Sequence, residues 1–420
     1  MTNLKLFSLE GKGLKLTSEE DIKPHIQDLL NSSDFEEIRL QGNTIGVEAA
    51  ATLASALEKQ KKLQIANLAD IFTGRLLNEI PPALESILRA CLALPSLHTL
   101  NLSDNAFGLN TQAPLVSFLS SHTALQHLYL TNNGLGPEAG TLIANALISL
   151  SSKKDSLRSS SEGKDTPALE TIICGRNRLE NGSMASWAKA FEAHRGIKVV
   201  KMVQNGIRQE GISLLLKQGL KFCEGLEVLD LQDNTFTSMG ARALADVLPG
   251  WGTLKELGVS DCLLSARGGV VLGEALGKGA NKELEVLRCQ YDEVDGKGVT
   301  GIVQALGKCE RLRRVELNGN KFDEEDPGVE ELRRVLEERR EKAGAEEGSE
   351  EWGLDELDEL EEPSDEEDEG EGEEEAEEED VKEKAERELK QVDQAEAENV
   401  PQVKDKEVDE LANLLGKTGL

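Results

Sequence analysis

Apolar residues recur along this chain in a fixed order, with polar residues between them. The order is clearest in three stretches: residues 97–107, 125–135 and 226–236. In each of them an apolar residue takes the first, fourth, sixth and eleventh places and asparagine takes the ninth. Leu100 and Leu102 alternate with Thr99 and Asn101, which is the two-residue period of a strand with one buried face. The pattern therefore predicts a short strand at the start of each unit.

The ninth place identifies the copies of this unit along the chain. It is filled at eleven positions: Lys12, Asn43, Ile71, Asn105, Asn133, Asn177, Asn205, Asn234, Cys262, Asp292 and Asn320. From Asn177 onward the steps are 28, 29, 28, 30 and 28 residues. The asparagine amide is expected to satisfy backbone groups in the turn after each strand. The first copy is degenerate, as an end cap should be.

The remainder of each unit reads as a helix. After Asn234, for example, Leu244, Val247 and Leu248 stand at helical spacing, and Pro249-Gly250 is expected to end the helix. A strand and a helix in about 28 residues is the leucine-rich repeat pattern. We therefore predict an α/β solenoid of about eleven strand-helix repeats, a horseshoe with parallel strands inside and helices outside.

Two steps are longer than the rest. The step from Ile71 to Asn105 is 34 residues, and the step from Asn133 to Asn177 is 44 residues. The second exceeds 28 residues by 16, and the excess is assigned to Ser151–Pro167. This segment is rich in serine, lysine and aspartate, so it is expected to be a surface loop.

Charge divides the chain into three parts. Residues 346–380 hold 23 acidic and no basic residues, whereas 381–420 hold 10 acidic and 7 basic ones. The total of −32 therefore leaves about −6 for the repeats. We predict a repeat domain over 1–343 with its last strand near 312–322, a disordered acidic tail over 344–380, and a charged, partly helical extension over 381–420. The tail is read either as a solubilising segment or as a dock for a basic partner.

Several classes of function are disfavoured. Nucleic acid is an unlikely ligand for a chain with so much negative charge. Six cysteines without a C-x-x-C pair suggest small core residues in a reducing compartment rather than a disulfide frame or zinc site. No signal-peptide-like or membrane-spanning apolar run is found, so an intracellular protein is expected. No Walker, G-x-S-x-G or H-E-x-x-H motif occurs, and the five histidines are expected on the surface or at helix ends.

The residue before each consensus position is not needed for the core and is expected to face outward on one rim of the horseshoe. We call this set the rim series: Gly42, Asp70, Asp104, Asn132, Arg176, Gln204, Asp233, Asp261, Tyr291 and Gly319. The series is either ordinary solvent-facing polarity or a recognition surface for a folded partner. Arg75, in the segment that lengthens the third unit, is either plain surface or a contact for an acidic or phosphate-bearing partner.

Six segments carry a resemblance to a known family. They are D-I-F-T-G-R at 70–75, L-S-D-N-A-F-G at 102–108, L-Y-L-T-N-N-G-L-G-P at 128–137, I-C-G-R-N-R-L-E-N-G-S at 173–183, M-V-Q-N-G-I at 202–207 and L-D-L-Q-D-N-T-F at 229–236. Over residues 1–343 the chain resembles the GTPase-activating proteins of the small GTPase Ran, and it looks most like the fungal members. The shared residues include places that the repeat pattern leaves free.

The resemblance implies a function and a site. Such a protein stimulates hydrolysis of GTP held by Ran in its GTP form, in support of nucleocytoplasmic transport, without a complete active site of its own. The family works without an arginine finger: the asparagine matching Asn132 positions the catalytic glutamine of the GTPase. Arg75 then serves docking, and the other partner-binding candidates are Asp70, Asp104, Arg176, Gln204 and Asp233.

The resemblance also sets expectations for partners and location. The GTPase carries the GTP and Mg²⁺, so no cofactor of the chain itself is expected. A cytoplasmic monomer follows, with no membrane or nucleic-acid partner; a perinuclear place and a ternary complex with a Ran-binding protein are left open. The alternative is a non-catalytic repeat scaffold or inhibitor, like ribonuclease inhibitor, that binds a folded protein. An autonomous hydrolase would need a catalytic constellation that the sequence lacks.

Overall fold

The computed structural model describes residues 4–160 and 165–361. They belong to one compact unit, Met1–Glu369; the second unit, Gly370–Leu420, lies outside the described residues. Within the described part, twelve parallel strands form one sheet in chain order. They are β1 (Leu6–Ser8), β3 (Glu37–Arg39), β5 (Ile65–Asn67), β6 (Thr99–Asn101), β7 (His127–Tyr129), β8 (Thr171–Ile173), β9 (Val199–Lys201), β10 (Val228–Asp230), β11 (Glu256–Gly258), β12 (Val286–Arg288), β13 (Arg314–Glu316) and β14 (Gly353–Leu354). The strands β2 (Lys15–Leu16) and β4 (Thr44–Ile45) pair separately.

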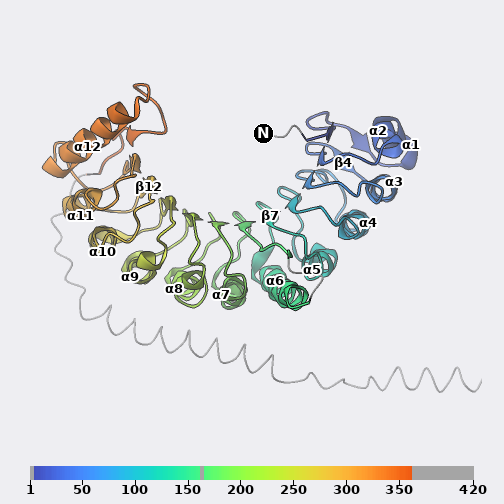
Figure 1. Ribbon diagram of the computed structural model, residues 1–420, viewed down its shortest axis with the longest axis horizontal. Helices are drawn as coiled ribbons and strands as arrows, with labels where there is room; N and C mark the ends of the chain where they lie inside the picture. The colour runs from blue at the N-terminus through green and yellow to red at the C-terminus, as the bar shows by residue number, and fades with distance from the viewer. Residues whose placement is uncertain (1–3, 161–164, 362–420) are drawn as a thin grey trace, which may run out of the picture. The chain divides into compact units, whose positions relative to one another are not determined.

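Helices connect successive strands and cover the outer side of this unit, while the strands line its inner side (Figure 1). They are α1 (Glu19–Ile22), α2 (Gln27–Asn31), α3 (Val47–Leu57), α4 (Ile80–Leu92), α5 (Gln112–Leu119), α6 (Gly136–Arg158), α7 (Met184–Ala193), α8 (Gln209–Gln218), α9 (Thr237–Val247), α10 (Ser265–Gly277), α11 (Gly296–Leu306) and α12 (Pro327–Ala343). Short 3-10 turns add η1 (Lys23–His25), η2 (Leu109–Thr111), η3 (Asn181–Ser183), η4 (Leu220–Phe222) and η5 (Leu248–Gly250). The predicted α/β repeat solenoid is confirmed. Among the described residues, none of these helices is long and apolar enough to span a bilayer.

The core lies between the sheet and the helices. Leu100 of β6 pairs in register with Leu128 of β7, which pairs with Ile172 of β8, and all three are fully buried. The flanking strand residues Thr99 and Asn101 are only half-buried, so the predicted alternation is confirmed. All six cysteines are free and buried. Burial raises the pKa of the Cys91, Cys174 and Cys223 thiols to about 12, so they act as small apolar residues.

Consensus asparagines form an unbroken hydrogen-bond ladder through the core from Asn105 to Asn234. The side chain of Asn133 donates to the backbone oxygens of Leu102 and Leu130, both at 3.0 Å. Its own side-chain oxygen accepts from the backbone N–H of Asn105, at 3.0 Å. Equivalent bonds are made by Asn105, Asn177, Asn205, Asn234 and Asn320. Each amide therefore joins two repeats and satisfies buried backbone groups, as the sequence predicted.

A second set of buried polar side chains joins the repeats at the opposite end of the strands. His122 Nε2 lies 2.6 Å from the backbone oxygen of Leu97, and His194 Nε2 lies 2.7 Å from that of Leu147. Trp251 and Asn281 donate to the backbone of the preceding repeat in the same way. Burial lowers the pKa of His194 to about 4, so its ring stays neutral and structural. These two histidines follow helices, as expected, but they are core residues rather than surface residues.

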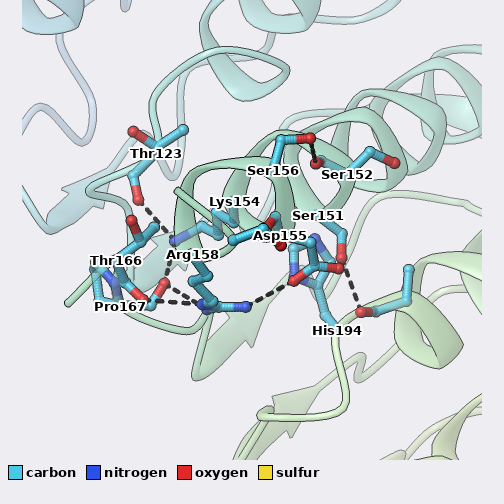
Figure 2. Close-up of polar contacts among 12 residues, drawn as sticks. Thr123, Ser151, Ser152, Lys154, Asp155, Ser156, Arg158, Thr166, Pro167 and His194 are labelled. Atoms are coloured by element: carbon cyan, nitrogen blue, oxygen red, sulfur yellow. Dashed lines mark hydrogen bonds and ion pairs between the residues drawn. The ribbon is translucent and has the colours of Figure 1, made fainter. Parts of the chain in front are cut away.

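The lengthened step before β8 contains helix rather than loop. Helix α6 runs through Arg158, so the surface loop expected at Ser151–Pro167 is wrong over its first half. Lys154 is 1 % exposed, and its Nζ donates to the backbone oxygens of Thr123, Leu125 and Pro167 at 2.7–2.9 Å (Figure 2). Burial lowers the pKa of Lys154 to about 8, which leaves the amine protonated at neutral pH with three N–H groups for three carbonyls. This cage anchors the insertion to the repeat before it.

The repeat fold continues beyond the predicted boundary at residue 343. Strand β14 pairs with β13, and the Asp355 carboxylate accepts from the backbone N–H groups of Leu317 at 2.8 Å and Asn318 at 3.0 Å. The backbone N–H of Glu361 donates to the backbone oxygen of Asn320 at 2.9 Å. Residues 344–361 thus cap the last repeat, because an open sheet edge leaves backbone groups to be satisfied. Residues 362–380 and the predicted extension 381–420 lie outside the described residues.

Candidate functional site

The rim series has a backbone conformation that the sequence analysis did not foresee. All ten members have positive φ: Gly42 (74°), Asp70 (48°), Asp104 (61°), Asn132 (55°), Arg176 (56°), Gln204 (53°), Asp233 (55°), Asp261 (54°), Tyr291 (55°) and Gly319 (73°). This left-handed conformation ends each strand and turns the chain toward the buried asparagine. Glycine adopts it freely, and Asn and Asp tolerate it better than other residues do. Glycine at both ends of the series was the available sequence signal.

Backbone hydrogen bonds hold the rim series in place. The N–H of each middle member donates to a carbonyl of the following repeat: Asp104 to Thr131 (2.8 Å), Asn132 to Gly175 (2.9 Å), Arg176 to Val203 (2.8 Å) and Gln204 to Gln232 (2.9 Å). The residue that follows each of these four is a buried ladder asparagine. Their side chains are exposed, as predicted, and Asp70 and Asp233 are half-buried. The rim is therefore a row of solvent-facing side chains on a fixed backbone.

Asn132 and Asp104 occupy the same rim position in two adjacent repeats and contact each other. The Nδ2 of Asn132 donates to the Oδ1 of Asp104 at 2.8 Å, and both side chains are exposed. The neighbouring Asn133 is fully buried in the ladder. The structure thus separates the two adjacent asparagines: one faces solvent, and the other supports the turn.

The remaining rim candidates lie on both sides of this pair. Gln204 donates a hydrogen bond to Asp233, whose pKa is raised from its usual value by partial burial and by the nearby Asp261 carboxylate. Arg176 is exposed between Asn132 and Gln204. On the other side, Asp70 accepts a hydrogen bond from the hydroxyl of Thr73. The rim therefore presents amide, carboxylate and guanidinium groups in one row, all suited to hydrogen bonding with a protein surface.

Arg75 does not project freely from its loop. Its Nε donates to the Thr44 hydroxyl at 2.9 Å and its Nη1 to the Thr17 hydroxyl at 3.0 Å. Its Nη2 donates to the backbone oxygens of Leu16 at 3.2 Å and Thr44 at 3.0 Å. The side chain is half-buried, so the expectation of an exposed loop arginine is wrong. These contacts tie the loop after β5 to β2 and β4, and any contact with a partner would come from the remaining face of the guanidinium.

The site has the character of a binding surface. Within residues 4–160 and 165–361, no group of three or more His, Cys, Asp and Glu side chains is arranged to hold a metal ion. Beyond their mutual hydrogen bond, Asn132 and Asp104 leave one amide hydrogen and three oxygen atoms close together on the rim for hydrogen bonds to a partner. Such a pair can orient a polar group of a partner by hydrogen bonding.

Comparisons with known proteins agree on a protein class. A leucine-rich repeat family model matches residues 223–245. Over 334 residues the chain is 39 % identical to Ran GTPase-activating protein 1 of Saccharomyces cerevisiae, covering 77 % of this chain and 80 % of that protein. It is 40 % identical over 203 residues to Ran GTPase-activating protein 1 of Xenopus laevis, covering 48 % and 34 %. It is 32 % identical over 321 residues to Ran GTPase-activating protein of Drosophila melanogaster, covering 76 % and 52 %.

Proposed function

The chain belongs to the Ran GTPase-activating protein family, and from that premise we propose that it accelerates hydrolysis of the GTP bound to Ran. The bond to the terminal phosphate of GTP is broken in the active site of the GTPase. This chain then acts as an activator of the partner's chemistry rather than as a hydrolase. A repeat scaffold or inhibitor that binds without accelerating hydrolysis is not favoured by these relatives.

The observation that carries the mechanism is the exposed amide of Asn132, held at 2.8 Å by Asp104 on a fixed rim. Small GTPases use their own glutamine to orient the attacking water, and they hydrolyse GTP slowly without an activator. An asparagine amide carries both hydrogen-bond donors and an acceptor, so it can hold a glutamine amide in one orientation. We assign Asn132 this positioning role, since fixing one reacting group in place can supply much of a rate enhancement.

The other rim residues are proposed to dock the GTPase. Asp70, Arg176, Gln204 and Asp233 extend the polar row on both sides of the pair of Asn132 and Asp104, over repeats that are joined by the buried ladder. Arg75 stabilises this surface indirectly, since its four hydrogen bonds fix the loop that follows Asp70. This arrangement favours a docking or structural role for Arg75 over that of an arginine finger.

Further features of the proposal concern the partner and the setting. The protein would act as a monomer on Ran in its GTP form, with GTP and Mg²⁺ carried by the GTPase and no cofactor of its own. A Ran-binding protein could join a ternary complex by contacting Ran alone. Cytoplasmic action, in support of nucleocytoplasmic transport, fits this role.

The direct test is GTP hydrolysis by purified Ran with and without sub-stoichiometric amounts of this protein. An activator should raise the single-turnover rate by ~10³–10⁵ at saturation and turn over many Ran molecules. A scaffold would bind Ran·GTP in a pull-down and leave the hydrolysis rate unchanged. Failure to bind or to accelerate would contradict the proposed function.

A further inference from the structure

The side chain of Asp104 has a role distinct from docking. We propose that Asp104 is a positioning residue that fixes which end of the Asn132 amide faces the GTPase. This inference rests on the proposed function, because it assumes that the Asn132 amide meets a polar group of the partner. It assigns Asp104 to the rate of the chemical step, whereas a docking residue would act on affinity.

The geometry leaves one orientation for the amide. The Asp104 carboxylate oxygen lies 2.8 Å from Nδ2 of Asn132, and a carboxylate can only accept hydrogen bonds. The nitrogen end of the amide is therefore the end turned toward Asp104. Both backbones are held by the next repeat, through bonds to Thr131 and Gly175 at 2.8 and 2.9 Å. These bonds fix the two backbones, and the hydrogen bond between the side chains then sets the orientation of the amide.

The orientation has a chemical consequence. With Nδ2 turned toward Asp104, the Oδ1 of Asn132 and the second Nδ2 hydrogen remain for the partner. The Oδ1 of Asn132 can accept a hydrogen bond from the amino group of the glutamine side-chain amide. The carbonyl oxygen of that glutamine is then free to accept from the attacking water. A reversed Asn132 amide would offer hydrogens instead and would hold the glutamine carbonyl away from the water.

Two substitutions of Asp104 separate this role from others. Asp104→Gly removes the acceptor, and the fold should accept it because glycine fills the same rim slot at Gly42 and Gly319. Asp104→Asn keeps an acceptor oxygen and a residue type that tolerates positive φ, but removes the charge. Asp261→Gly is the matched control, since Asp261 is an exposed aspartate in the same slot with φ of 54° and lies outside the assigned site.

The experiment measures single-turnover hydrolysis of Ran·GTP as a function of activator concentration, with thermal unfolding of each variant alongside. We expect Asp104→Gly to lower the saturated rate about ten- to a hundredfold, with a small change in the half-saturating concentration. The saturated rate of Asp104→Asn should stay within roughly threefold of the parent rate, and that of Asp261→Gly should equal the parent rate. Combining Asp104→Gly with Asn132→Ala should slow the reaction no further than Asn132→Ala alone.

Other outcomes overturn the inference. If both Asp104 variants raise the half-saturating concentration and keep the saturated rate, Asp104 is a docking residue. If Asp104→Gly changes neither quantity, Asp104 has no part in the reaction. If Asn132→Ala alone keeps full stimulation, the proposed function of the rim fails and this inference falls with it. If Asn132→Ala is slow while Asp104→Gly is normal, only the positioning role is wrong.

Discussion

The backbone N–H of Asn133 donates to the side-chain oxygen of Asn177 at 2.9 Å, although 44 residues separate them. The same bond joins Asn105 to Asn133 across 28 residues. The insertion in α6 and the segment after it therefore leave the ladder uninterrupted. The ladder therefore supports the backbone beneath Asp104, Asn132, Arg176 and Gln204 without a break.

Asn133→Ala should destabilise the protein while sparing the site chemistry. The change removes donors to the Leu102 and Leu130 carbonyls and the acceptor for the Asn105 N–H, all in the core. Leaving buried backbone groups unsatisfied should lower the free energy of unfolding by about 1–3 kcal/mol. Denaturant unfolding measures this, with Asn132→Gly as the exposed control, since glycine adopts the φ of 55° freely. Equal midpoints for both variants would show that the ladder adds no stability.

Asp292→Asn should stabilise the protein. Asp292 is fully buried in a ladder position, and its Oδ1 accepts from the Cys262 N–H at 2.8 Å. Its Oδ2 has no hydrogen-bond partner among the described residues. Asparagine would offer an amide there, as Asn320 does toward Cys289 and Leu317 at 2.7 Å. Burial raises the pKa of the Asp292 carboxyl well above its usual value, so the acid is favoured in its neutral form.

The sign of the pH dependence follows from that shift. A carboxyl whose pKa is higher in the folded state binds more protons when folded, so stability falls as pH rises above about 4 toward the folded pKa. Asp292→Asn removes this loss. Thermal unfolding should therefore show that the variant melts slightly above the parent at pH 4 and further above it at pH 8. A gain that shrinks with rising pH would contradict the assignment.

Truncation separates the cap from the acidic tail. A chain ending at residue 361 should melt like the full chain and stimulate hydrolysis fully at moderate salt, because the rim series is retained. A chain ending at residue 343 should melt several degrees lower, because β14 and the Asp355 contacts to Leu317 and Asn318 are lost. Scanning calorimetry and the hydrolysis assay measure both. A loss of stimulation above tenfold in the 361-residue chain would make the tail part of the site.

Arg75→Ala should loosen the N-terminal repeats and weaken the encounter with Ran more than the chemical step. Four hydrogen bonds to Thr17, Thr44 and Leu16 are lost, at a cost of roughly 1–3 kcal/mol locally. Hydrogen exchange should quicken at the Gly46 amide, which donates to Leu16 at 2.7 Å. The exposed Arg89 of α4 supplies the control, Arg89→Ala. A saturated rate thousands of times lower with unchanged exchange and affinity would identify an arginine finger.

Sequence periodicity predicts a great deal of this structure because each repeat reports its own strand, ladder residue and rim position. It does not report contacts between distant segments. Arg75 bonds to residues 31 to 59 positions earlier, and the cap at Asp355 meets Leu317 across 38 residues. The left-handed rim was also missed, because Arg176 and Gln204 disguise a preference that Gly42 and Gly319 show. His122 and His194 each stand three residues before the first apolar residue of a repeat, Leu125 and Ile197. This shared spacing could have placed them in the core.

The division of roles between two adjacent asparagines is the central claim, and one paired measurement tests it. Thermal unfolding and saturated single-turnover hydrolysis of Ran·GTP would be measured on Asn132→Ala and Asn133→Ala, at a temperature where both remain folded. We predict that Asn132→Ala unfolds at a higher temperature than Asn133→Ala, although alanine tolerates the φ of 55° less well than asparagine does. It should hydrolyse roughly 10²–10³-fold more slowly than the parent, by analogy with loss of one transition-state donor. Asn133→Ala should unfold earlier and hydrolyse near the parent rate. An Asn132→Ala protein that keeps the full saturated rate would contradict the account.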